Sequence, residues 1–272
     1  MDQSQGSQTW YSQGHVLSEL GRYEGAISRY DRVIELKPDN YQAWCDRGYA
    51  LEHLERYEEA IVSFERAISL APKFTPAWHG KGIALGRLNR YEEAVTCFDR
   101  IIKWSRNDYR AWYNKGNALS HLCQYKEAIA TFDKVLEFKP DKYQAWYKRG
   151  VALAYLGRYA DALTSLENAV TIKPSCHYAW NYRGIVLIKL ERCREALTSF
   201  EQSLNSESSN PNAWYGKACC YALLGDVELT VNNLYRAFDL SPNLHRLMAK
   251  TEPIFQEMHQ HPEFQALFST SN

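Results

Sequence analysis

Tryptophan recurs along this chain at a fixed interval of 34 residues. Seven of the eight tryptophans keep that step, and they are Trp10, Trp44, Trp78, Trp112, Trp146, Trp180 and Trp214. Glycine keeps the same step from Gly14 to Gly184, and alanine keeps it from Ala26 to Ala196. Three residue types do not share one 34-residue spacing by chance. The chain is therefore built from copies of one structural unit rather than around a single core.

Each copy carries the pattern of two helices. In residues 41–74, apolar residues recur at three- and four-residue spacing over the first fourteen positions and again from the seventeenth to the thirtieth, which is typical of amphipathic helices. Glu55 and Arg56 form the short turn between the two blocks. Pro72 is expected to end the second helix because proline lacks a backbone N–H, and Asn40 is placed to cap the first helix. Every copy is predicted to be an antiparallel helical hairpin.

The residues that repeat have structural roles. Gly48 and Ala60 are small, which lets two helices approach closely where they cross. Trp44, Tyr57 and Phe64 are large and are expected to fill the gaps within and between hairpins. The repeated residues are therefore scaffold, and function is expected at the positions that vary between copies.

The 34-residue period and the order Trp, Gly, Tyr, Ala, Phe, Pro resemble the tetratricopeptide repeat. Strings such as GRYEGAISRYDRVIELKPDN and QYKEAIATFDKVLEFKPDK are similar to bacterial members of that family. The resemblance covers residues 7–244 and implies an all-α fold, a right-handed superhelical solenoid of antiparallel helix hairpins. Its seven copies span residues 7–40, 41–74, 75–108, 109–142, 143–176, 177–210 and 211–244.

The chain continues past the last copy. Residues 245–268 hold many apolar side chains and two prolines, Pro253 and Pro262, so they are predicted to form capping helices broken near those prolines. The alternative is that this segment binds a partner. Residues 1–6 and 269–272 are expected to be disordered.

Composition argues against several classes of partner. Lysine and arginine together number 32, as do aspartate and glutamate, so no net charge attracts nucleic acid. No stretch approaches the roughly 18 apolar residues that cross a bilayer, so membrane insertion is not expected. The N-terminal sequence lacks the features of a secretory signal peptide. These observations predict a cytoplasmic protein.

The sequence offers no recognisable catalytic or cofactor site. The seven cysteines show no CxxC spacing, and His259 and His261 stand without further ligands, so no metal site is predicted. The strings of phosphate-binding loops, dinucleotide-binding loops, nucleophile elbows and zinc-protease helices are missing. We therefore expect no cofactor and no enzymatic activity.

The resemblance implies that the first helices line a concave groove that binds a peptide or an amphipathic helix of a partner protein. The second, fifth, sixth, ninth, twelfth and thirteenth positions of each copy are expected to face it. The candidate binding residues at these positions are Tyr49, Arg110, Tyr113, Asn114, Asn117, Tyr147, Lys148, Val151, Tyr155, Tyr178, Asn181, Tyr182, Ile185, Lys189 and Tyr215.

The C-terminal half of this predicted groove is aromatic, and aromatic side chains are enriched in the cores of protein interfaces. The sequence thus predicts a non-catalytic adaptor, or scaffold, for protein partners. Two alternatives remain. Individual tyrosines could pack against the neighbouring hairpin, and the chain could form homo-oligomers through the groove or the C-terminal cap.

Overall fold

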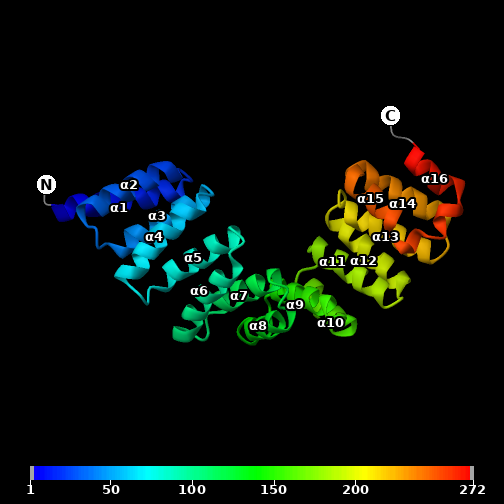
Figure 1. Ribbon diagram of the computed structural model, residues 1–272, viewed down its shortest axis with the longest axis horizontal. Helices are drawn as coiled ribbons and strands as arrows, with labels where there is room; N and C mark the ends of the chain where they lie inside the picture. The colour runs from blue at the N-terminus through cyan, green and yellow to red at the C-terminus, as the bar shows by residue number, and fades with distance from the viewer. Residues whose placement is uncertain (1–2, 270–272) are drawn as a thin grey trace. The chain divides into compact units, whose positions relative to one another are not determined.

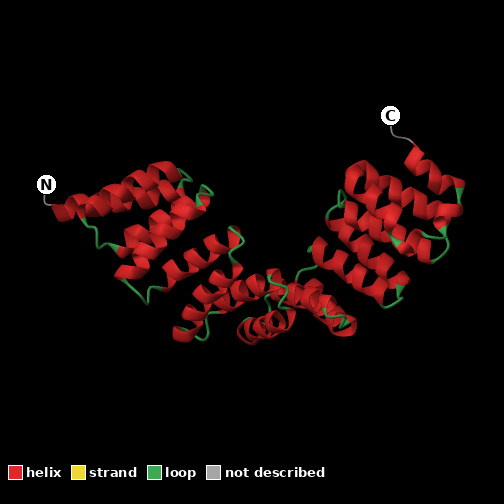
Figure 2. Cartoon of the chain, in the orientation of Figure 1, coloured by secondary structure: helices red, strands yellow, loops and turns green. Residues whose placement is uncertain are grey.

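The computed structural model describes residues 3–269. These residues form helices joined by short turns, and no strand occurs among them (Figure 2). The chain divides into two compact units, Met1–Phe138 and Lys139–Asn272. The predicted all-α class and its construction from helical hairpins are confirmed.

The first unit contains four consecutive hairpins (Figure 1). Within each hairpin the two helices pack on each other, and each second helix packs on the first helix of the next hairpin. The helix pairs are α1 (Gln3–Glu19) with α2 (Tyr23–Leu36), α3 (Tyr41–His53) with α4 (Tyr57–Leu70), α5 (Thr75–Arg87) with α6 (Tyr91–Trp104), and α7 (Tyr109–His121) with α8 (Tyr125–Phe138). Because α1 begins at Gln3, residues 3–6 are helical rather than disordered, and residues 1–2 lie outside the described part.

The second unit contains three hairpins and a C-terminal segment. The helix pairs are α9 (Tyr143–Tyr155) with α10 (Tyr159–Ile172), α11 (His177–Lys189) with α12 (Cys193–Ser206), and α13 (Pro211–Leu223) with α14 (Val227–Leu240). The C-terminal segment comprises α15 (Pro242–Thr251), the 3-10 turns η1 (Pro253–Phe255) and η2 (Met258–Gln260), and α16 (Pro262–Ser269). Ser269, expected to be disordered, ends α16, and residues 270–272 are not described.

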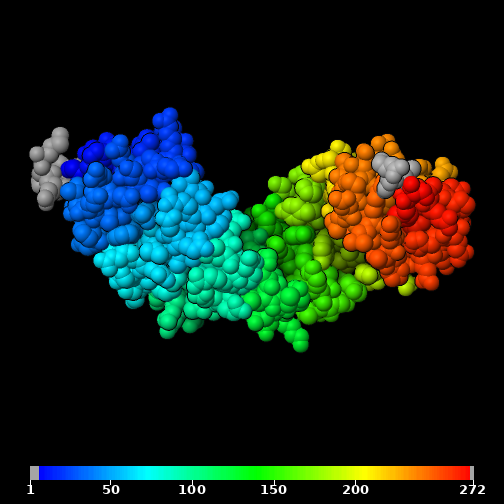
Figure 3. All heavy atoms as spheres, turned by 45° about the horizontal axis from the view of Figure 1, so that its top comes forward, coloured from blue at the N-terminus to red at the C-terminus, as the bar shows by residue number. Residues whose placement is uncertain are grey.

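The C-terminal segment covers the last hairpin. Phe255, Met258 and Phe264 are buried together with Leu234 and Phe238 of α14. In the space-filling view the orange and red side chains of α14–α16 form one continuous mass (Figure 3). The segment therefore closes the hydrophobic end of the second unit.

The repeated tryptophans hold the start of each hairpin by the same hydrogen bond. In six copies the indole Nε1–H donates to the backbone carbonyl six residues upstream, as from Trp44 to Pro38 at 3.0 Å. The acceptor is Arg106 O for Trp112, at 2.8 Å, and Ser208 O for Trp214, at 3.2 Å. Since a backbone carbonyl accepts the bond, it persists in the two copies that lack the proline.

Glycine is required where two helices meet an aromatic ring. A Cβ atom on Gly48 would lie 2.6 Å from the Phe64 ring of the same hairpin, and one on Gly80 of the next hairpin would lie 2.3 Å from that ring. Gly184 and Gly216 contact the Phe200 ring in the same way. Real Cβ atoms do not approach this closely, so the rings occupy the space that the glycines leave free.

The turn between the two helices of every hairpin contains one residue in the left-handed region. Glycine fills it in three hairpins, at Gly21, Gly157 and Gly225. In the other four it is Glu55, Asn89, Cys123 and Glu191, with φ between 58° and 61°. In these four hairpins the left-handed residue carries its side chain two positions before the second helix begins.

Candidate functional site

The largest group of predicted binding residues in the second unit lies on α9 and α11, which contact each other. The ring of Tyr147 on α9 meets two rings of α11 edge to face. Its centroid is 4.7 Å from that of Tyr178 and 6.1 Å from that of Tyr182. The structure therefore brings together three tyrosines that the sequence places in two different copies.

The phenol of Tyr178 stays neutral. Burial raises its pKa, and hydrogen bonds with the side chains of Tyr143 and Cys176 raise it further. Cys176 is buried in a cluster with Val170, and the Tyr178 and Tyr147 rings both pack against this cluster. Tyr178 is thus held by side-chain hydrogen bonds and by the cluster where its ring meets Tyr147.

Two polar groups beside these rings lack partners. The Lys148 side chain, next to Tyr147 on α9, is half-buried, and burial lowers its pKa. Its ammonium forms no hydrogen bond or ion pair with residues 3–269. The Asn181 Oδ1 atom on α11 is buried and accepts no hydrogen bond. Buried polar groups are normally paired, so these two are available to a ligand.

The remaining predicted residues extend this surface along both helices. Val151 on α9 is half-buried, Ile185 on α11 is exposed three residues after Tyr182, and Tyr155 is exposed at the end of α9. Lys189 is the last residue of α11, about 16 Å from Tyr178 at 1.5 Å per residue. We call Tyr147, Lys148, Tyr178, Asn181, Tyr182 and Ile185 the aromatic surface.

Tyr215 does not belong to a binding surface, which corrects the prediction. Its side chain is only 7% exposed and lies under the C-terminal segment. The ring centroid is 5.3 Å from that of His245 on α15 and 5.7 Å from that of Phe255 in η1. The 34-residue pattern gives Tyr215 a surface position because it cannot show that the residues after the last copy fold back over α13.

His245 lies in the contact between α13 and the C-terminal segment, and its burial predicts that this contact depends on pH. The ring is buried, with Nε2 3.2 Å from Asn212 Oδ1 and Nδ1 3.3 Å from Ser241 O. Burial lowers the pKa of the imidazole below its ordinary value of about 6.5, so the unfolded state binds the proton more readily. This contribution to stability is complete above the unfolded pKa and is lost as the pH falls below it toward the folded pKa.

We therefore expect the urea midpoint of the protein to fall between pH 8 and pH 5.5 by more than it falls in a His245→Gln variant, which cannot titrate at this position. His261→Gln, outside this contact, should keep the full pH dependence. Equal pH dependence in wild type and His245→Gln would contradict the role assigned to this ring.

In the first unit, the predicted residues form a more polar surface. Tyr49 donates its hydroxyl to Pro76 O at 2.7 Å, and its ring packs edge to face on Phe64 at 5.1 Å. Tyr113 packs against Phe132 at 6.1 Å. Both tyrosines thus support their hairpins.

Three other predicted residues of the first unit lie on α7. Arg110 is exposed and Asn114 is half-buried. Asn117 carries a buried Oδ1 atom without a hydrogen-bond donor. The first unit therefore also contains an asparagine with an unpaired oxygen, but this asparagine does not lie beside a cluster of tyrosine rings like that of the aromatic surface.

Tyr11 and His15 on α1 and Asp46 on α3, which occupy groove-facing positions of the first two copies, form an acidic network. The Tyr11 hydroxyl donates to Asp46 Oδ2 at 2.6 Å, and His15 Nε2 lies 3.3 Å from the same oxygen. Burial raises the pKa of the Asp46 carboxyl. His79 and Asp108 form a similar pair at 3.0 Å. Position in the copy places Tyr11, His15, Asp46 and His79 on this face, but the pairing of each histidine with a carboxylate of the next copy appears only in the structure.

The described residues also bear on two other kinds of site, a metal-binding group and a membrane-spanning helix. Within residues 3–269, no three histidine, cysteine or acidic side chains gather as a metal-binding group. None of the helices in that range combines the length and the apolar character needed to span a membrane.

Comparison with known proteins identifies the repeat. Four family models, each described as "Tetratricopeptide repeat", match the chain. One matches both residues 11–73 and residues 183–243, and the other three match residues 51–115, 109–142 and 143–176. The search of curated proteins finds no match.

Solved structures share the architecture. A tetratricopeptide repeat protein from Parabacteroides merdae is 16% identical with a TM-score of 0.70, over 90% of this chain and 98% of that one. MamA from Desulfovibrio magneticus is 23% identical with a TM-score of 0.59, over 62% and 96%. YrrB, described as a repeat protein with an unusual peptide-binding site, is 25% identical with a TM-score of 0.58, over 69% and 97%. The chain belongs to the tetratricopeptide repeat family.

Proposed function

We propose that this protein is a non-catalytic adaptor that holds a segment of a partner protein on the aromatic surface of α9 and α11. The observation that carries the proposal is the combination of three clustered tyrosine rings with two unpaired polar groups, Lys148 and Asn181. Aromatic rings supply large rigid contact area, and unpaired polar groups orient what they bind.

The chemistry of the surface describes the segment. The rings favour apolar or aromatic side chains, the Asn181 carbonyl oxygen accepts an N–H, and Lys148 pairs with a carboxylate. An amphipathic segment with an acidic residue near its apolar face meets all three requirements. The peptide-binding site named for YrrB supports this kind of ligand, and the seven free cysteines support a reducing, cytoplasmic location.

The test is a double substitution in the aromatic surface. Cross-linking mass spectrometry with the wild type first identifies the partners. The double variant Tyr147→Ala, Tyr182→Ala should keep the helicity that circular dichroism measures, and it should no longer recover these partners in a pull-down. Tyr235→Ala is the matched control because Tyr235 is 63% exposed on α14 of the same unit. If the double variant still recovers the same partners, the aromatic surface is not the binding site.

Self-association is the second candidate, and exposed apolar residues on α15 favour it. Leu244 and Leu247 are 55% and 63% exposed. A homo-oligomer through the C-terminal segment would cover them. Sedimentation over a concentration series separates self-association from the adaptor function. A protein that stays monomeric at all concentrations does not self-associate, and the adaptor function is then the remaining candidate.

A further inference from the structure

Tyrosine begins the second helix in the first five hairpins, at Tyr23, Tyr57, Tyr91, Tyr125 and Tyr159. In the first unit this ring fills a defined space. Tyr23 stacks on His53 of the next hairpin, with centroids 4.4 Å apart and planes at 4°. Tyr91 stacks on His121 at 4.7 Å and 2°. The tyrosine thus occupies the gap between its own turn and the end of the following first helix.

The sixth hairpin lacks this ring. Its second helix begins with Cys193, and the residue in place of the stacked histidine is Leu223, which is 47% exposed. A hollow of about 750 Å³ lies here, and its lining includes Ile188, Lys189, Glu191, Cys193, Leu223 and Ile254. This volume falls within the roughly 300–1,000 Å³ of small-ligand sites.

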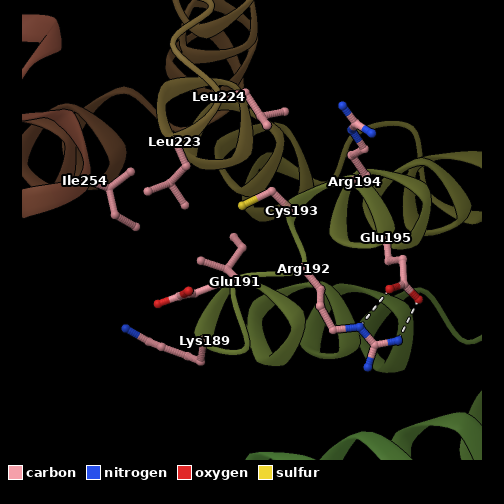
Figure 4. Close-up of a pocket in the computed structure, with 10 residues that line it drawn as sticks. Lys189, Glu191, Arg192, Cys193, Arg194, Glu195, Leu223, Leu224 and Ile254 are labelled. Carbon is pink, nitrogen blue, oxygen red and sulfur yellow. Dashed lines mark hydrogen bonds and ion pairs between the residues drawn. The ribbon is translucent and has the colours of Figure 1, made fainter.

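The side chains around the hollow leave its centre apolar (Figure 4). The sulfur of Cys193 points toward the same space as Leu223 and Ile254. Arg192 turns away and pairs with Glu195 at 2.7 Å, as the equivalent Arg90 does with Glu93 at 2.6 Å. The charges of Lys189, Glu191 and Arg194 stand at the edge of the hollow, and its apolar lining comes from Ile188, Leu223, Leu224 and Ile254.

Glu191 stands at the position whose side chain accepts the tyrosine hydroxyl in two of the earlier hairpins. Tyr91 donates its hydroxyl to Asn89 Oδ1 at 2.6 Å, and Tyr125 donates to Cys123 Sγ at 3.5 Å. Asn89 and Cys123 are the left-handed turn residues of their hairpins, and Glu191 holds the same conformation at φ 60°. Its carboxylate forms no hydrogen bond or ion pair with any described residue and is therefore available to a phenol.

We propose that this hollow binds a tyrosine side chain from a segment of a partner protein. The ring lies between Cys193 and Leu223, where the tyrosines of earlier hairpins lie, and its hydroxyl donates to Glu191. Leu223, Leu224 and Ile254 lose contact with water when the ring enters, which favours binding. The proposal does not depend on the aromatic surface, because the hollow adjoins the opposite end of α11 from Tyr178.

The thiol of Cys193 provides the first test. Five other cysteines are buried and Cys123 is exposed, so a Cys123→Ser variant leaves Cys193 as the accessible thiol. A blocked Ala-Tyr-Ala tripeptide should slow its alkylation by N-ethylmaleimide with saturation. The Phe tripeptide should bind roughly tenfold more weakly because it lacks the hydrogen bond to Glu191. The Leu tripeptide should not protect. No protection, or equal protection by all three, would overturn the proposal.

Filling the hollow provides the second test. In fluorescence anisotropy with a labelled Ala-Tyr-Ala tripeptide, Cys123→Ser, which changes a thiol outside the hollow, should bind as the wild type does. Cys193→Tyr restores the residue of the earlier hairpins and should bind at least about tenfold more weakly. Leu223→Glu serves the same purpose if Cys193→Tyr lowers the melting temperature. The oligomeric state is measured as well. If the wild type is a dimer and Cys193→Tyr is a monomer, a second copy of this chain occupies the hollow, and the proposal of a peptide from another protein is refuted.

Discussion

Gly80→Ala and Gly82→Ala are each expected to lower the free energy of unfolding by about 1–3 kcal/mol, the usual cost of overpacking a core. The added Cβ would lie 2.3 Å from the Phe64 ring at position 80 and 2.7 Å from the Phe98 ring at position 82. Both rings are buried, so neither has free space into which to move. Urea denaturation followed by circular dichroism measures the loss, and hydrogen exchange assigns it to α4–α6.

The same helix contains the control. A Cβ added to Gly86 on α5 would meet no atom within 4 Å, and alanine there should leave stability unchanged or raise it by up to about 1 kcal/mol through helix propensity. Phe98→Leu should recover only a small part of the loss in Gly82→Ala, because at the equivalent place in the second unit a Cβ on Gly150 would still lie 2.9 Å from Leu166. A loss in Gly86→Ala as large as that in Gly82→Ala would show that helix flexibility, not the ring, requires glycine.

Phe200→Ala is expected to destabilise the second unit by about 3–5 kcal/mol, the range for large aromatic deletions in cores. Phe200 is fully buried, and its ring separates Gly184 of its own hairpin from Gly216 of the next. Its removal leaves a cavity that both hairpins share, so protection from hydrogen exchange should fall in α11–α14 together. A loss confined to α11 and α12 would contradict the shared cavity.

Phe200→Leu is the graded comparison for this cavity. The preceding hairpin carries Leu166 at the equivalent position and buries it completely against Gly150. The leucine variant should therefore lose less than half as much stability as the alanine variant. Equal losses would mean that the shape of the aromatic ring matters more than the volume it fills.

The sequence predicts the fold because its scaffold residues act locally and repeatedly. Trp44, Gly48 and Phe64 each contact residues of their own or an adjacent copy, and the 34-residue period brings the same partners to each copy. Periodicity is therefore sufficient to derive the hairpins. The tail that covers Tyr215 has no repeat to reveal it, so this contact could be found only in three dimensions.

The candidate site was predictable in part, for a related reason. Position in the copy selected Tyr147 and Tyr182, and the structure brings their rings together. The same rule did not indicate that Tyr49 bonds to Pro76, since that contact depends on the neighbouring side chains. Position in the copy also did not select Cys193. At that position the first five copies have tyrosine, and the absence of tyrosine there was the feature that pointed to the hollow.

The rings of Phe64 and Phe200 give the array a direction. Each is covered from the C-terminal side by the first helix of the following hairpin, through Gly80 and Gly216. The last hairpin has no successor, and the C-terminal segment covers its Leu234 instead. Removing the first hairpin would therefore leave the Phe64 ring covered, whereas a C-terminal truncation that removes α13 would expose the Phe200 ring. The truncation that removes the first hairpin should therefore be tolerated better than the truncation that removes α13 and the segment after it, which should aggregate.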